Sequence, residues 1–279
     1  MIKREYVKCK VCNGEIKRIN EKYNLVQCNN CQLIFCSTIY SQDEFIKVYD
    51  EFYNKKNAIY SNHSVIEYNM LLENKNIKIG FYRSKLIKKH ILNNSCQSVL
   101  ELGSGVGLIG SYLRNMNSEI KYTGIEIDKE TFEKSKFLNL NVINDDFTAI
   151  SRIEESFDVI MLWEVIEHLQ DLSLFLKLAY DKLKIGGKII LSTPNFNKIH
   201  NYPKREKDEI FQDKPPVHLN FFTEKNIKNI FEIYQFKNCK VTVKKFPYIN
   251  IKSLDFYINC IKSIFNKYNG STIHFEATK

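Results

Sequence analysis

The spacing of apolar residues changes at about residue 97 and divides the chain into two parts. Before it, apolar side chains recur every three to four positions over residues 41–56, 64–73 and 81–92, which predicts amphipathic helices. After it, short apolar runs alternate with helical stretches. That alternation predicts an α/β domain built on a mostly parallel sheet.

The second part of the chain supports a detailed assignment. Strands are expected at 98–102, 121–126, 140–144, 157–163, 187–193, near 239–245 and at 272–277, and helices at 106–115, 129–138, 171–184, 223–235 and near 251–267. The pair Gly186-Gly187 predicts the point where a helix ends and a strand begins. Prolines interrupt residues 194–217, which we interpret as a loop or lid.

Four cysteines near the N-terminus have the spacing of a metal site. Cys9, Cys12, Cys28 and Cys31 form the pattern C-x2-C-x15-C-x2-C, and short strands at 15–19 and 25–27 would bring the two pairs together as a zinc ribbon. Two disulfides are the alternative, which a cytoplasmic chain disfavours. Four thiolates leave no open coordination position, so the predicted Zn²⁺ is structural.

A glycine-rich turn follows the first strand of the second part. Residues 99–107 read Val-Leu-Glu-Leu-Gly-Ser-Gly-Val-Gly, with Gly103, Gly105 and Gly107 at alternate positions and Glu101 just before them. Glycine is required where the backbone adopts unusual angles or where a ligand lies against it. A parallel strand that ends in such a turn predicts a cofactor site at its carboxyl end.

Acidic and aromatic residues follow the next strands. Glu126 ends the second strand, 19 residues after Gly107, where a carboxylate can accept both ribose hydroxyls of an adenosine. Asp146 and Phe147 follow the third strand and could bind and cover an adenine ring. These positions predict a cofactor that contains adenosine.

Two such cofactors fit the glycine pattern. Residues 105–110 match G-x-G-x-x-G, which is weak evidence for a nicotinamide dinucleotide. The glycines begin too early for that fingerprint, already at Gly103, and Glu101 is charged where a dinucleotide-binding strand is usually apolar. A carboxylate there suits a cationic amino group, which favours S-adenosylmethionine.

The ordered motifs of residues 101–107, 124–126, 145–147 and 157–168 resemble those of class I S-adenosylmethionine-dependent methyltransferases. The resemblance covers about residues 96–279 and implies a Rossmann-like sheet of seven strands, with helices on both faces and the last strand antiparallel. It implies that the Gly103–Gly107 turn passes under the amino-acid part of the cofactor. It further implies that Glu126 holds the ribose, that Asp146 and Phe147 bind the adenine, and that Trp163 and Glu164 lie beside the methionine part.

The substrate is less defined by this resemblance. Residues 163–169, Trp-Glu-Val-Ile-Glu-His-Leu, resemble the branch that includes ubiquinone-type O-methyltransferases. An N-terminal four-cysteine ribbon before such a domain resembles bacterial methyltransferases that act on deoxysugars and surface glycans, although a ribbon also precedes the cofactor domain in a ribosomal-RNA guanine methyltransferase. The implied organisation is a zinc ribbon at 1–37, a helical linker or lid at 38–95 and the methyltransferase domain at 96–279.

Two histidines are candidates for a general base that deprotonates the acceptor. His168 stands four residues after Glu164, on the same face of a helix, and a backbone contact is its alternative role. His218 lies at the end of the predicted lid, between Pro215-Pro216-Val217 and an apolar segment. Asp128 could bind the cofactor, but capping the next helix is favoured.

Composition narrows the remaining choices. The chain has 279 residues, a net charge of +9 and 44% apolar residues, and its start lacks the apolar stretch of a signal peptide. A cytoplasmic protein without membrane insertion is therefore expected. The leading hypothesis is an enzyme that methylates a small molecule, a sugar or nucleotide-sugar. The alternative is an RNA base methyltransferase that holds RNA with the ribbon and the basic helix 81–92. A binding module without catalysis would have spoiled cofactor motifs, which are intact here.

Overall fold

The structure is a computed structural model that describes residues 4–41, 44, 47, 61–73, 77–197, 214–247 and 250–279, with the side chains of 61–63 excepted. Most of the helix expected at 41–56 lies outside these residues, as does the greater part of the lid expected at 194–217. The other predicted elements fall within them.

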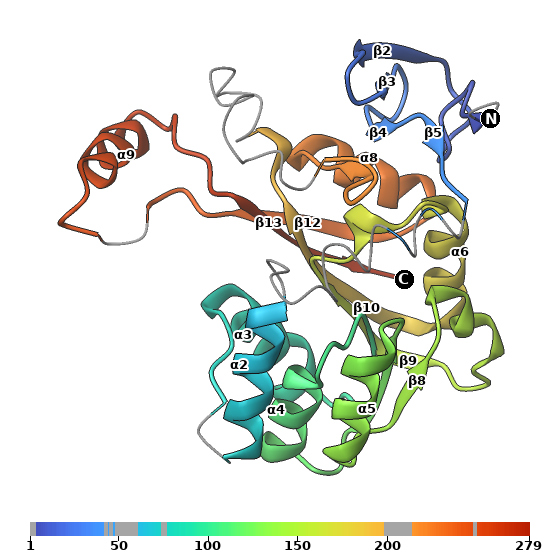
Figure 1. Cartoon of the computed structure of the whole chain (residues 1–279), viewed down its shortest axis with the longest axis vertical. Coiled ribbons are helices and arrows are strands. Elements are labelled where there is room, and N and C mark those ends of the chain that lie inside the picture. Colours follow the sequence, from blue (N-terminus) through green and yellow to red (C-terminus); the bar gives the residue numbers. More distant parts are fainter. Residues whose placement is uncertain are drawn as a thin grey trace.

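A sheet of seven strands forms the centre of the molecule (Figure 1). Its strands, in spatial order, are β12 (Lys237–Val243), β13 (Thr272–Thr278), β10 (Leu183–Pro194), β9 (Phe157–Trp163), β6 (Ser98–Leu102), β7 (Lys121–Glu126) and β8 (Val142–Asn144). Strand β13 runs antiparallel to both β10 and β12, whereas the pairs from β10 to β8 are parallel. The predicted fold class, a seven-stranded sheet with its last strand antiparallel, is confirmed.

Helices lie around the sheet because its strands carry apolar side chains on both faces. The helical elements are α2 (Ser61–Leu72), α3 (Phe81–Ile87), the π-helix η2 (Lys88–Leu92), α4 (Leu108–Met116), α5 (Lys129–Phe137), the 3-10 helices η3 (Phe147–Arg152) and η4 (Ile166–His168), α6 (Leu172–Lys182), α8 (Glu224–Ile233) and α9 (Leu254–Ile264). Alternate residues of β6 belong to two different cores. Leu100 packs in the cluster that includes α6 and α8, and Val99 in the cluster that includes α3, η2 and α4.

Local sequence signals account for several helix starts. The Asp128 side chain accepts a hydrogen bond of 2.8 Å from the Thr131 N–H at the beginning of α5, which confirms its predicted capping role. Thr223 and Asn226 form a reciprocal capping box at the start of α8. The expectation for Gly186-Gly187 is wrong. Helix α6 ends at Lys182 and β10 already begins at Leu183, so Gly186, with φ of +78°, serves an irregular stretch of that strand, where its pairing with β9 shifts register.

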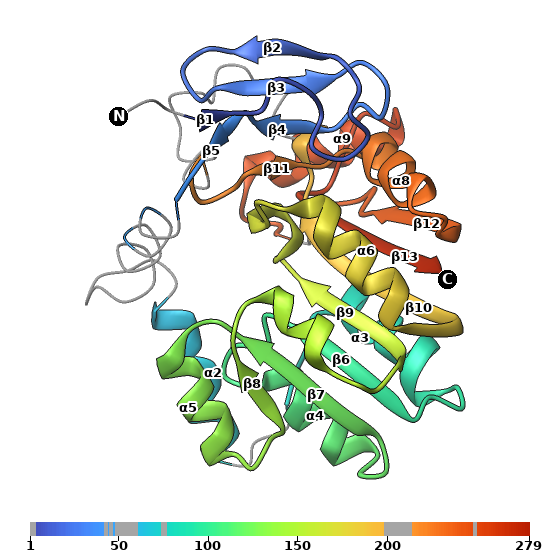
Figure 2. The ribbon, with the colours of Figure 1, turned by 90° about the vertical axis from the view of Figure 1, so that its right-hand side faces the viewer.

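The cysteine-rich segment forms a second sheet that includes a strand from the far end of the chain. Strands β2 (Ile16–Asn20), β3 (Leu25–Cys28) and β4 (Ile34–Cys36) are antiparallel, and β11 (Asn220–Phe221) pairs with β4 to complete the sheet (Figure 2). Strands β1 (Arg4–Glu5) and β5 (Thr38–Ile39) form a separate pair. The Phe35 side chain is fully buried in the same cluster as Ile227 and Ile230 of α8. The ribbon therefore shares a core with the large domain.

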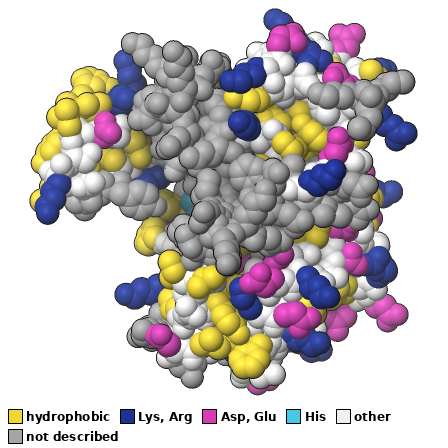
Figure 3. Space-filling view, viewed as in Figure 1, with side chains coloured by type: hydrophobic (Ala, Val, Ile, Leu, Met, Phe, Trp, Pro, Cys, Tyr) yellow, Lys and Arg dark blue, Asp and Glu magenta, His cyan; other side chains and the backbone are white. Residues whose placement is uncertain are grey.

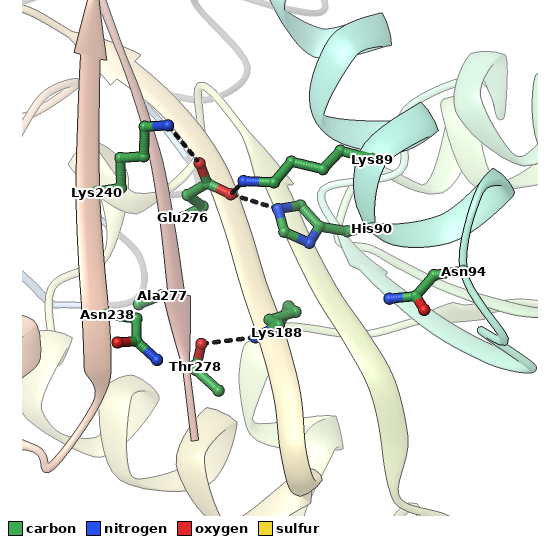
Figure 4. A pocket seen from close by; sticks show the side chains of 9 residues that line it. All are labelled: Lys89, His90, Asn94, Lys188, Asn238, Lys240, Glu276, Ala277 and Thr278. Atoms are coloured by element: carbon green, nitrogen blue, oxygen red, sulfur yellow. Dashed lines mark hydrogen bonds and ion pairs between the residues drawn. The ribbon is translucent and has the colours of Figure 1, made fainter.

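A surface hollow of about 430 Å³ lies between η2 and strands β10, β12 and β13 (Figure 4). Glu276 of β13 is 8% exposed there; Lys89 binds it at 2.6 Å, and His90 and Lys240 are its other partners. Burial alone would raise the pKa of Glu276, but the hydrogen bonds from Lys89 and His90 hold it below its ordinary value. The cluster is thus a neutralised buried carboxylate that fastens η2 to the sheet.

Candidate active site

The turn between β6 and α4 strongly favours glycine at two positions. Gly103 has φ of +70° and Gly107 has φ of +87°. A Cβ atom at Gly103 would lie 2.5 Å from Val165 Cγ2, and one at Gly107 would lie 2.2 Å from Leu140 Cδ1. Gly105, with φ of +54°, faces open space instead, with nothing within 4 Å of the position of its Cβ. The middle of the turn therefore leaves room for a ligand against the backbone.

Glu126 connects the end of β7 to this turn. Its Oε2 accepts a hydrogen bond of 2.7 Å from the Gly105 N–H, and its Oε1 accepts one of 2.9 Å from the Asp128 N–H. Burial raises the pKa of Glu126 to about 6, and these two backbone bonds act in the opposite direction. Each carboxylate oxygen has a second lone pair, so the side chain can still accept hydroxyl groups of a ligand.

Glu101 is a second acidic side chain at the same edge of the sheet. It is 2% exposed and accepts a hydrogen bond of 2.6 Å from the Tyr122 hydroxyl. Burial raises the pKa of Glu101 to about 8, against the opposing effects of this hydrogen bond and of the Arg83 charge. In the ligand-free protein the carboxyl group is therefore largely protonated at neutral pH, and a cation placed beside it would favour the ionised form.

Arg83 of α3 is a site residue that was not predicted. The carbon of its guanidinium group lies 5.0 Å from the centroid of the Trp163 ring, a cation–π distance, and its charge lowers the pKa of Glu101. In the sequence Arg83 is one of several basic residues of an amphipathic helix, and nothing local distinguishes it. Only the packing of α3 against the end of β9 brings it to the edge that carries Glu101.

The predicted adenine-binding residues have structural contacts of their own. The Asp146 Oδ1 accepts a 2.8 Å hydrogen bond from the Thr148 N–H and so caps η3. The Phe147 ring packs edge-on against Phe175 of α6, with centroids 6.1 Å apart. Both follow β8 as expected, and their contact with adenine stays a prediction.

Strand β9 ends in an unusual backbone conformation. Glu164 has φ of +56°, which a residue with a side chain adopts at a cost, and its N–H donates to the Ser192 carbonyl at 3.0 Å. Trp163, the residue before it, is 7% exposed. The Trp163 Nε1 is buried and has no hydrogen-bond partner among the described residues. The strand end is thus held in a strained form next to the glycine turn, since Val165 contacts Gly103.

Glu167, His168 and His218 form a compact cluster, with one ligand atom of each within 4.8 Å of the others. The two imidazole rings meet edge to face with centroids 4.7 Å apart, and His168 Nδ1 lies 2.8 Å from the Val217 carbonyl oxygen. Burial, and then the neighbouring His168, lowers the pKa of His218 to about 2. The structure therefore brings both predicted base candidates together and adds Glu167, whose Oε2 accepts the Thr193 hydroxyl at 2.9 Å.

This cluster has the donors of a metal site. Two imidazoles and one carboxylate are common ligands of divalent transition metals, and one ligand atom of each of the three side chains lies within 4.8 Å of the others. A divalent cation held there would acidify a bound hydroxyl group and would occupy His168 Nε2, so it is an alternative to a general base at this imidazole. In the sequence Glu167 is one residue of a longer motif, and its proximity to His218 does not follow from their spacing.

The ribbon holds the backbone of this cluster in place. Asn220 of β11 donates through Nδ2 to the carbonyls of Ile166, at 3.0 Å, and of Leu169, at 2.8 Å. The Leu219 N–H donates to the Glu167 carbonyl at 2.8 Å, and the Leu219 carbonyl accepts from the Cys36 N–H of β4 at 2.9 Å. The chain from 217 to 221 is therefore fixed between the ribbon on one side and η4 on the other.

The four predicted metal ligands do lie together. Their sulfur atoms are within 4.8 Å of one another, with Cys9 Sγ 3.6 Å from Cys31 Sγ and Cys12 Sγ 3.4 Å from Cys28 Sγ. Tetrahedral Zn²⁺ with bonds of about 2.3 Å places its sulfurs about 3.8 Å apart. All four are free thiols and not disulfides. The donor set and its geometry fit a structural zinc ion.

Comparison with known proteins agrees with the fold and the glycine turn. A family model described as "Methyltransferase domain" matches residues 75–241. The match covers more than half of the chain, which therefore belongs to this methyltransferase family.

Curated relatives are similar over part of the chain. A ubiquinone biosynthesis O-methyltransferase of Pelagibacter ubique is 26% identical over 129 residues, which are 43% of this chain and 53% of that protein. A malonyl-[acyl-carrier protein] O-methyltransferase of Bacillus anthracis is 27% identical over 158 residues, 54% of this chain and 58% of that protein. The chain thus spans about half the length of these curated relatives.

One solved structure illustrates the shared fold. The SAM-dependent methyltransferase of Archaeoglobus fulgidus superimposes with a TM-score of 0.51 at 17% identity, covering 84% of this chain and 99% of that one.

Substitution of a ribbon cysteine tests the zinc assignment. We expect Cys9→Ser to lose bound zinc and to lower the free energy of unfolding by more than about 3 kcal/mol, because metal binding contributes directly to folding. Zinc content by atomic emission and a thermal melt measure both effects. Cys239→Ser, outside the cluster, is the matched control. Normal zinc content with an unchanged melt would reject the site.

Glu101 makes a prediction about pH. Its pKa is raised in the folded protein, so the unfolded chain loses this proton first, and stability falls as pH rises from about 5 to about 8. Glu101→Gln removes this effect while its amide oxygen still accepts the Tyr122 hydroxyl. Between pH 5 and pH 8.5, the free energy of unfolding of the variant should rise by about 2–4 kcal/mol relative to that of the wild type. Denaturant titration measures it, with the exposed Glu119→Gln as control, and an equal difference at both pH values would contradict the assignment.

Proposed function

We propose that the protein transfers a methyl group from S-adenosylmethionine to a small-molecule acceptor, namely a hydroxyl group of a sugar or nucleotide-sugar. One observation carries the cofactor assignment. Two buried carboxyl groups, Glu101 and Glu126, flank a glycine turn whose centre, Gly105, faces open space. Membership in the methyltransferase family supports the same reading.

The side chains at this edge suit the separate parts of that cofactor. Glu126 offers oxygens to the ribose hydroxyls, and Glu101 offers a carboxyl group that a neighbouring ammonium group would ionise. Arg83, whose guanidinium carbon lies 5.0 Å from the centroid of the Trp163 ring, suits the cofactor's carboxylate. Asp146 and Phe147 remain the proposed adenine contacts. When bound, S-adenosylmethionine supplies an activated methyl group, and the protein must align the acceptor and exclude water.

His168 is proposed as the general base for the acceptor. Its Nδ1 faces the Val217 carbonyl oxygen at 2.8 Å, so this nitrogen carries the proton and Nε2, which lies 4.0 Å from Glu167 Oε1, is the acceptor nitrogen. A neutral imidazole in this tautomer can take a proton from a hydroxyl group. Burial keeps His218 from becoming a charged imidazolium near neutral pH. We therefore assign it a positioning role against the His168 ring.

The packing of the ribbon against the large domain favours a small acceptor over RNA. Its strand β4 pairs with β11, and Phe35 and Cys31 are buried against the large domain, so this side of the ribbon is occupied by packing. On the basic helix, Lys89 binds Glu276. Both curated relatives are named O-methyltransferases, which favours an oxygen atom as the acceptor.

Cofactor binding tests the first part of this proposal. Glu126→Gln should weaken S-adenosylmethionine binding roughly 10–100-fold, because a charge-assisted hydrogen bond to the ribose is lost. Calorimetric titration of the purified protein measures it. Glu119→Gln serves as the control, since this carboxylate is exposed and lies before β7, away from the glycine turn. Unchanged affinity in Glu126→Gln would reject the ribose assignment.

Turnover tests the second part. Methyl transfer from labelled cofactor is measured on nucleotide-sugars, lipid-linked sugars and RNA, and we expect incorporation into the sugar acceptors. With the best acceptor, His168→Ala should lower kcat roughly 100-fold or more, and His218→Ala should lower it less, with cofactor affinity unchanged in both. Incorporation into RNA alone would overturn the acceptor class, and full activity of His168→Ala would overturn the base.

A further inference from the structure

Helix α9 stands apart from the rest of the molecule. It lies on an arm between β12 and β13, and Figure 1 shows it projecting away from the sheet and its helices. None of its eleven residues is buried. Its N-terminal neighbours from residue 250 and its C-terminal neighbours to residue 269 are likewise exposed or half-buried.

The exposed side of this helix is its apolar side. Its large apolar residues recur at intervals of three and four, so they share one face. Their exposed fractions are 76% for Leu254, 52% for Tyr257, 41% for Ile258, 57% for Ile261 and 74% for Ile264. A surface helix of a globular protein normally turns such a stripe toward the core.

Adjacent residues extend the apolar surface and give it a positive border. Ile251 and Phe265, at the two ends of the helix, are 67% and 68% exposed. Lys252, Lys262 and Lys267 accompany them, against the single acidic residue Asp255 in this segment. In Figure 3 the hydrophobic atoms of this lobe gather in one patch with dark blue groups at its margin.

We propose that α9 is a membrane-surface anchor that docks this protein on a bilayer containing anionic lipids. Apolar and aromatic residues on one face and lysines beside them are the chemistry of helices that lie in the lipid–water interface. Each lysine near an anionic surface adds attraction. The contact is peripheral, since no helix in the described part of the chain has the length and apolarity needed to cross a bilayer.

A second copy of the chain is a weaker fit to this surface. A symmetric pair would place the same face of each α9 helix against the other. The lysine border would also meet its own like charges in a symmetric pair, whereas it complements anionic lipid.

The arm also leaves the sheet at the edge that carries the candidate active site. Thr272, where the arm returns to the sheet, pairs with Pro194 at the carboxyl end of β10, and Ser192 of the same strand pairs with Trp163. Docking through α9 therefore places the carboxyl edge of the sheet on the side of the arm. This inference stands apart from the proposed methyl transfer, because vesicle binding is measured without cofactor or acceptor.

Vesicle co-sedimentation of the full chain tests the proposal. We expect binding to vesicles of phosphatidylcholine mixed with phosphatidylglycerol, and much weaker binding to phosphatidylcholine alone. Ile258→Glu and Ile261→Glu should each lower the partition coefficient roughly tenfold, because each removes an apolar side chain from the interface. The control is Ile185→Glu, at a position that is 97% exposed in β10 and outside the arm.

Two further measurements complete the test. Lys262→Ser should lower binding to the anionic vesicles by roughly fivefold and leave the weak binding to neutral vesicles unchanged. Light scattering reports the mass of the free protein. If wild type does not sediment with anionic vesicles, or if the two glutamate variants bind as wild type does, the proposal is overturned. It is also overturned if light scattering shows a dimer, Ile258→Glu converts that dimer to a monomer, and neither protein binds vesicles.

Discussion

The two residues of β11 connect the ribbon to the turn that carries Glu167 and His168. Their backbone completes the ribbon sheet through β4, and the Asn220 side chain binds two carbonyls of the turn that carries Glu167 and His168. A strand of two residues has little stability of its own, so it depends on both neighbours. The four-cysteine ribbon thereby becomes part of the support of the turn that carries Glu167 and His168, although its cysteines lie far from these residues in sequence.

Much of the fold followed from local patterns. Strands β6, β7 and β9 have their predicted bounds. Strands β6 and β9 are buried and mostly apolar, and each of the three ends at a turn or a polar residue. The cysteine cluster and the glycine turn could also be predicted from the sequence, because the spacing of the residues defines both. Strand β11, Arg83 and the proximity of Glu167 to His218 were missed, because each depends on contacts between distant segments. The domain boundaries, the cofactor contacts and the base stay predictions.

The cofactor edge combines features that do not favour stability in the ligand-free protein. Glu101 and Glu126 are buried with raised pKa values, and Glu164 has a left-handed backbone. Buried acids and strained residues gather where binding is to be specific, because a ligand with complementary charge relieves them. An ammonium group of a ligand beside Glu101 would stabilise its ionised carboxylate. An apolar side chain packed at the same place could not. Glu276 provides the contrast, since its own chain neutralises it with Lys89.

The position of α9 bears on which acceptors can reach the site. The arm begins after Val243 and returns at Thr272, at the carboxyl edge where β10 and β9 also end. If that edge lies beside a lipid surface, an acceptor held at the surface by an apolar anchor diffuses in two dimensions past the cluster of Glu167, His168 and His218. A freely dissolved acceptor gains nothing from this arrangement. An exposed apolar helix carries a risk of aggregation, and docking on a lipid surface would cover it.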